Sequence, residues 1–250
     1  MRCPLCDQEV SALHKRSHLI PEWSYQKCYN ENHKLVHFSI DKEFAAKKQK
    51  GMYDEIICES CESQSQIYDR YASLIFGDHS ACPTDLVSKQ ILHEGNITYE
   101  RWENLDFHKL QNFVFICILR THISERKSGK VLLPEKHFKG MRDLYLNDLT
   151  MNRSTYPIMI VKYSDLDGFG DVISLPYANK RDGHHVIEFS CGGYQFQTYV
   201  SSHEKPEYTK WGSLNPNNST IVFHLSIKET GTFKGAKPKL ITMARKMPLK

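Results

Sequence analysis

Four of the eight cysteines form two pairs, and each pair has two residues between its members. Cys3 and Cys6 make the first pair, and Cys58 and Cys61 make the second, after a gap of 51 residues (58 − 6 − 1). Two such pairs supply the four thiolates that a tetrahedral zinc ion binds. The alternative is two unrelated pairs of buried thiols. We predict one structural zinc ion on these four residues, whereas no partner at this spacing exists for Cys28, Cys82, Cys117 or Cys191.

A histidine lies between the two pairs, in the phrase Ser17-His18-Leu19-Ile20-Pro21. Leu19 and Ile20 predict a short strand that Pro21 ends, which places His18 at a strand edge near the first pair. A neutral imidazole with an ordinary pKa of about 6.5 can take a proton from water at neutral pH. Taken alone, a histidine beside a strand is more often structural, and the nearby His14 fits a surface position.

Two basic residues, Lys15 and Arg16, precede the histidine phrase. Their charges could hold a phosphate, and the arginine offers a planar fork of donors. The alternative is ordinary solvated charge.

The residues that follow Cys61, ESQSQIYDRYASLIFGDHS, predict a helix. Its apolar residues recur every three or four positions, which indicates one buried stripe: Ile67, Tyr71, Leu74 and Ile75. Glu62, Gln66 and Asp69 are expected on another face of the helix.

Three phrases together resemble the HNH (ββα-metal) endonuclease family, over residues 1–80. They are Cys3-Pro-Leu-Cys6, Ser17-His18-Leu19-Ile20-Pro21 and Ile56-Ile57-Cys58-Glu59-Ser60-Cys61-Glu62. The resemblance implies zinc knuckles that brace a β-hairpin against a helix, His18 as the general base, a catalytic Mg²⁺ or other divalent cation, and DNA as the partner. Some bacterial members are effectors in phage defence, which the resemblance permits.

The chain departs from the family pattern at two positions. Ser17 stands where the family usually has an Asp or His that binds the catalytic metal, and Glu62 stands where a His or Asn is frequent. Carboxylate oxygens suit Mg²⁺ and Mn²⁺. Glu62 is therefore a candidate metal ligand, together with Asp69 and Ser17; Asp54 is another candidate, and spacing does not decide among them.

The remainder of the chain predicts a second, larger unit. Residues 77–100 are polar and irregular and are expected to be a linker. Helices are expected over residues 103–125 and 135–149, and five strands with a period of two follow from Tyr156. Gly192-Gly193 indicates a hairpin turn. The segment DLDGFGD, residues 165–171, is expected to be a turn rather than a calcium loop, because it lacks the EF-hand spacing.

Composition and charge narrow the class of protein. The 250 residues are 40% hydrophobic, and no apolar run approaches the roughly 20 residues of a membrane helix. We therefore expect a soluble cytoplasmic protein, whose cysteines favour metal binding over disulfides. The formal net charge is +4, and six basic residues lie in the last twenty. Such a basic tail can contact phosphates, or it can be an ordinary solvated end.

The sequence thus predicts an α+β protein with a zinc-braced, treble-clef-like ββα-metal nuclease domain (residues 1–82). Helices and an antiparallel sheet follow in a domain of unknown role (residues 83–250). The expected function is metal-dependent hydrolysis of phosphodiester bonds in DNA. The alternative from another class is an inactive zinc-stabilised nucleic-acid-binding or adaptor protein, which Ser17 favours; a third is a zinc module that mediates assembly. A homo-oligomer or a protein partner through residues 83–250 stays open.

Overall fold

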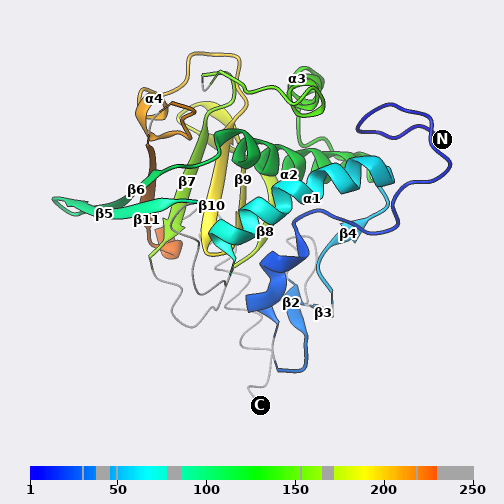
Figure 1. Ribbon diagram of the computed structural model, residues 1–250, viewed down its shortest axis with the longest axis horizontal. Coiled ribbons are helices and arrows are strands. Elements are labelled where there is room, and N and C mark those ends of the chain that lie inside the picture. The colour runs from blue at the N-terminus through cyan, green and yellow to red at the C-terminus, as the bar shows by residue number, and fades with distance from the viewer. Residues whose placement is uncertain are drawn as a thin grey trace.

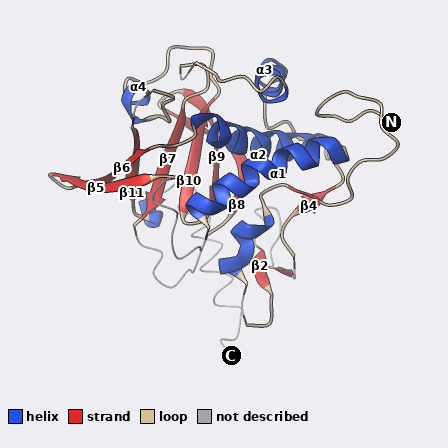
Figure 2. Ribbon diagram, in the orientation of Figure 1, coloured by secondary structure: helices blue, strands red, loops and turns tan. Residues whose placement is uncertain are grey.

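The computed structural model has an α+β architecture, in which helices α1 and α2 lie side by side across one face of a large sheet (Figures 1 and 2). The structure describes residues 1–29, 31–37, 46–48, 50–77, 86–152, 154–164, 172–217 and 219–229. Cys82, the segment 165–171 and the basic tail lie outside these residues. No helix among them is both long enough and apolar enough to cross a membrane.

The N-terminal part contains two small strand pairs and one helix. Strand β1 (Ser17–His18) pairs antiparallel with β4 (Tyr53–Asp54), and β2 (Leu35–His37) pairs with β3 (Ala46–Lys48). The 3-10 helix η1 (Glu22–Cys28) follows Pro21. The predicted strand is therefore present, but it ends at His18, before the buried Leu19 and Ile20. Helix α1 (Glu59–Phe76) begins inside the second cysteine pair, because Cys58 is its N-cap residue.

Two further helices follow the N-terminal part at the predicted places. Helix α2 (Phe107–Lys127) starts four residues later than expected, where the Asp106 side chain accepts a hydrogen bond from the Lys109 backbone N–H at 3.0 Å. Every residue from Leu110 to Ile123 is buried, as the dense apolar pattern predicts. Helix α3 (Glu135–Leu146) and the short helix α4 (Tyr208–Gly212) lie nearer the surface.

The large sheet has seven strands in the order β5-β6-β11-β7-β10-β9-β8. Their bounds are β5 Ser88–Glu94, β6 Ile97–Glu103, β7 Ile158–Tyr163, β8 Ser174–Arg181, β9 His184–Cys191, β10 Tyr194–Tyr199 and β11 Thr220–Leu225, and the 3-10 helix η2 (Ile227–Glu229) follows. Two predictions are wrong here. The sheet is not wholly antiparallel, since β11 runs parallel to β7. Residues 88–103 are a hairpin rather than part of a linker.

One buried apolar cluster joins the N-terminal part to the sheet. Phe76 at the end of α1 contacts Trp102, Phe113 of α2 and Phe196 of β10, with ring centroids 5.1 to 6.4 Å apart. The turn between β9 and β10 packs against the same helix end: Gly192 has a φ of +61°, and a Cβ there would lie 2.6 Å from the Phe76 carbonyl oxygen. The predicted turn at Gly192 therefore packs directly against the end of α1.

Candidate metal centre and the histidine beside it

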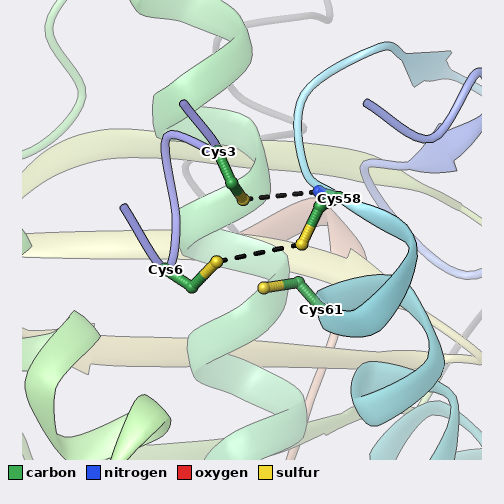
Figure 3. Close-up of side chains that lie close together, drawn as sticks. All are labelled: Cys3, Cys6, Cys58 and Cys61. Atoms are coloured by element: carbon green, nitrogen blue, oxygen red, sulfur yellow. Dashed lines mark hydrogen bonds between the residues drawn. The ribbon is translucent and has the colours of Figure 1, made fainter. Parts of the chain in front are cut away.

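Four cysteine side chains come together at the start of α1, as the spacing predicts. The sulfur atoms of Cys3, Cys6, Cys58 and Cys61 all lie within 4.8 Å of one another, and the four side chains point toward a common centre (Figure 3). The Sγ atoms of Cys6 and Cys58 are 3.8 Å apart. Zinc–sulfur bonds of about 2.3 Å in a tetrahedron separate the sulfurs by about 3.8 Å. The cluster therefore fits a zinc ion, and none of the four forms a disulfide.

Backbone hydrogen bonds shape the first knuckle. The Cys3 N–H donates to the Gln8 carbonyl at 3.0 Å, and the Asp7 N–H donates to the Cys3 carbonyl at 2.8 Å. Asp7 adopts a φ of 60°, a left-handed conformation that Asp tolerates better than most residues. The reversal of the chain lets both sulfurs of the pair face the same point.

Donors around the sulfur of Cys3 favour its thiolate form. A hydrogen bond from the Cys61 thiol, with further help from backbone N–H groups, lowers the pKa of Cys3 to about 4 against the opposing effect of burial. One of those donors is the Cys58 N–H, 3.3 Å from the sulfur. Since zinc binds thiolates rather than thiols, these donors favour the form of Cys3 that binds the metal.

His18 lies next to the carboxylate of Glu22, which is not among the predicted site residues. Its Nε2 atom is 2.9 Å from Oε2 of Glu22, and the Tyr29 hydroxyl donates to the other oxygen of Glu22 at 2.8 Å. Glu22 Oε2 has no hydrogen-bond partner among the described residues, and the contact becomes an ion pair only when His18 is protonated. Burial lowers the pKa of His18, and the Glu22 charge opposes this change. The sequence feature that could have identified this partner is the position of Glu22 four residues after His18.

The basic residues before His18 are on the surface. Lys15 and Arg16 are both exposed, and the Arg16 guanidinium lies 5.8 Å from the centre of the Tyr53 ring. Tyr53 also makes an edge contact with the His18 ring. His14 is half-buried, with Nε2 3.7 Å from a Glu59 oxygen. Arg16 and His18 thus both lie against the Tyr53 ring.

The three tentative ligands of a catalytic metal are arranged differently from the expectation. Glu62 and Asp69 lie on the face of α1 that packs against α2, where both form ion pairs with Arg120, at 3.2 and 3.1 Å. Arg120 is fully buried and also donates to the Ser65 hydroxyl. The predicted stripe is therefore only partly correct: Tyr71 and Ile75 are buried, but Ile67 is 57% exposed while Glu62 is buried. Ser17 is buried too, and in the described part of the chain its hydroxyl has no partner.

Asp54, the remaining candidate ligand, is tied to the end of α2. One carboxylate oxygen accepts from the Ser124 hydroxyl at 2.7 Å, and the other is 3.0 Å from Lys127 Nζ. Burial would raise the pKa of Asp54, but these two donors outweigh it and hold the pKa below its ordinary value. The contacts anchor β4, and through it β1, to α2.

No family model, no curated protein and no solved structure matches this chain. The resemblance to HNH endonucleases therefore depends on the three sequence phrases.

Proposed function

We propose that the chain is a metal-dependent endonuclease of the HNH type, which hydrolyses phosphodiester bonds in DNA and carries zinc in a structural role. The observation that carries the proposal is one compact arrangement. The antiparallel pair β1–β4 precedes α1, His18 lies on the first of those strands, and the cysteine cluster fastens the chain before β1 to the start of α1.

His18 and Glu22 have complementary roles in the proposed reaction. The imidazole takes a proton from a water molecule as the water oxygen attacks phosphorus and the bond to the leaving oxygen breaks. Glu22 stabilises the imidazolium that results, since its carboxylate oxygen lies 2.9 Å from Nε2. The exposed Lys15 and Arg16 attract the flanking phosphates.

A catalytic cation would neutralise the scissile phosphate and assist the leaving oxygen. Glu62 and Asp69 fit such a cation poorly in this structure, because both already neutralise the buried Arg120. Ser17 offers only a buried neutral hydroxyl. We therefore assign no step of the reaction to a metal on these three residues.

The decisive experiment is cleavage of supercoiled plasmid by the purified protein. Mg²⁺, Mn²⁺, Ni²⁺ and EDTA are compared side by side, with zinc content measured in each sample. We expect nicking or linearisation with at least one divalent cation and none with EDTA, while zinc remains bound. Absence of cleavage in every metal by zinc-loaded protein would remove the nuclease proposal.

The second candidate is a zinc-stabilised nucleic-acid-binding or adaptor protein without catalysis. What favours it is the pairing of Glu62 and Asp69 with Arg120, together with Ser17 at the usual ligand position. The variant Ser17→Asp separates the two candidates. If the natural protein cleaves nothing and Ser17→Asp creates activity, the site is a degenerate nuclease and the binding function replaces our proposal.

A further inference from the structure

A tyrosine hydroxyl reaches the carboxylate that lies beside His18. Tyr29 is the C-cap residue of η1, and its hydroxyl donates to Oε1 of Glu22 at 2.8 Å. The other oxygen of the same carboxylate, Oε2, lies 2.9 Å from Nε2 of His18. In the described part of the chain, Oε2 has no hydrogen-bond partner. The two oxygens of Glu22 therefore have different neighbours, a phenol on one side and an imidazole on the other.

Without such a contact the Glu22 carboxylate would not keep one orientation. A glutamate side chain has several rotatable bonds, and fixing them costs about 1.5–2 kcal/mol of rotamer entropy. The Glu22 side chain is also 39% exposed, so that water competes for its oxygens. Among the described side chains, Tyr29 is the one that donates a hydrogen bond to this carboxylate. The phenol therefore decides which oxygen turns toward His18.

Packing restricts both the tyrosine and the carboxylate. The Tyr29 ring is stacked on the imidazole of His33, with ring centroids 4.0 Å apart and planes 19° from parallel. Aromatic pairs of this kind contribute about 0.5–1.5 kcal/mol beyond the area that they bury. A Cβ at the buried Gly51 would lie 2.9 Å from Oε2 of Glu22, so the backbone before β4 closes that side of the carboxylate. The hydroxyl therefore approaches Glu22 from a fixed direction.

The Tyr29 hydroxyl keeps its proton throughout the neutral range. Burial raises the pKa of Tyr29 to about 12, and the Glu22 carboxylate adds to this rise. A phenol with this pKa is a hydrogen-bond donor at every pH at which plasmid cleavage is ordinarily measured. The donor is therefore available to Glu22 whether or not His18 carries a second proton.

We propose that Tyr29 is a positioning residue for the reaction on His18, which acts by holding the Glu22 carboxylate in place. This inference rests on the proposed function. When His18 takes a proton from the attacking water, the imidazolium forms beside an anionic oxygen that already faces it. Glu22 then needs no reorientation as the charge develops. Tyr29 acts through Glu22 rather than on the substrate.

The test is steady-state cleavage of supercoiled plasmid by Tyr29→Phe, which removes only the hydroxyl. We expect kcat to fall about tenfold at an unchanged KM for the plasmid, because a misplaced carboxylate weakens stabilisation of the imidazolium and leaves DNA binding intact. Combined with Glu22→Gln, the change should cause no loss beyond that of Glu22→Gln alone. The matched control is Tyr177→Phe: Tyr177 donates to Glu188 at 2.8 Å in the large sheet, so a hydrogen bond of the same kind is lost without effect on kcat.

Crystal structures of the natural protein and of Tyr29→Phe distinguish failure of this inference from failure of the proposed function. In the variant we expect the nearest Glu22 oxygen to move more than about 4 Å from Nε2 of His18, beyond the range of an ion pair. A carboxylate that keeps its place would overturn the inference whatever the cleavage result, and so would a kcat that Tyr29→Phe and Tyr177→Phe affect equally. If the natural protein cleaves nothing, the nuclease proposal fails, and the two crystal structures decide whether Tyr29 holds Glu22.

Discussion

At the scale of single residues, His18 is the side chain on which the proposed chemistry depends. Its ring is held in place by β1, by the edge contact with Tyr53 and by the close approach of the Glu22 carboxylate to Nε2. A base of this kind contributes roughly 10²- to 10⁴-fold to a hydrolysis rate. We expect His18→Ala to lower plasmid cleavage by that factor while zinc content and the unfolding temperature stay unchanged. Cleavage at the natural rate would exclude His18 as the base.

Glu22 should affect the same reaction less strongly. Glu22→Gln keeps the size of the side chain but removes the charge that stabilises the imidazolium. We expect a smaller loss of cleavage than in His18→Ala, and almost no further loss when both changes are combined, because the carboxylate acts through the histidine. Losses that multiply in the double variant would show that Glu22 acts independently of His18.

Arg120 is a buried cation whose removal leaves two carboxylates without a partner. We expect Arg120→Met to lower the free energy of unfolding by about 3 to 5 kcal/mol, the usual cost of breaking a buried ion pair from one side. Urea unfolding measures this change. The control is Arg70→Met, since Arg70 is an exposed arginine of α1 and its loss should cost well under 1 kcal/mol.

His122 makes stability depend on pH. Burial lowers its pKa to about 4 from 6.5, and its Nδ1 accepts the Leu133 N–H at 3.1 Å. A histidine that is neutral when folded takes up a proton on unfolding below pH 6.5, so the stability it contributes is lost as pH falls from 6.5 toward 4. We expect His122→Asn, whose side-chain oxygen can accept the same N–H, to lose less stability over this interval in thermal unfolding at pH 7 and pH 5.

At the scale of elements, the cysteine cluster connects the first knuckle to α1. Cys58→Ser should release zinc and lower the unfolding temperature, because the free energy of metal binding is part of the free energy of folding. Metal analysis should find about one zinc per natural chain and far less in the variant. Cys28→Ser is the control, since Cys28 lies outside the cluster. A folded natural protein without zinc would disprove the assignment.

The sequence predicted those elements whose periodicity reports on burial. Helix α2 and the central strands carry dense or alternating apolar residues, and both were found close to the predicted bounds. The β5–β6 hairpin was missed because β5 is exposed on both faces, and β6 alternates only over its last residues, where the buried positions include the charged Glu100. The burial of Glu62 in α1 was missed for a different reason. Its charge, like that of Asp69, is compensated by Arg120, which is 51 residues beyond Asp69 in the chain (120 − 69), and local periodicity cannot register a distant partner.

In the candidate site, too, local sequence spacing predicted some contacts and missed others. The spacing of the cysteines predicted their cluster because both members of each pair are close in sequence. Glu22, the partner of His18, is also close in sequence. An acidic residue in the first turn of a helix is common, however, because its charge interacts favourably with the helix dipole, so Glu22 did not stand out as a site residue. The buried ion pairs of Arg120 could have been inferred from its position within an apolar run, because arginine is rarely buried unless it is paired.

At the scale of the whole molecule, the predicted boundary at residue 82 does not divide the hydrophobic core. One buried cluster includes Cys3, Phe76, Phe113 and Phe196. We expect metal release and loss of the sheet to occur in one transition, because such a core unfolds cooperatively. Zinc release, followed with a chromogenic chelator, and far-UV circular dichroism should therefore give the same midpoint on heating. A zinc release that precedes the loss of sheet by many degrees would indicate two independent domains.

The close approach of Gly192 to the end of α1 restricts how this protein can diversify. Any side chain at that turn would collide with the Phe76 carbonyl, and the positive φ disfavours other residue types as well. A recombination event that exchanged residues 1–82 for those of another protein would bring in a helix end that does not pack against this turn. We therefore expect the cysteine-bearing segment and the sheet to be inherited together, and gene fusions to join this chain at its ends rather than between its halves.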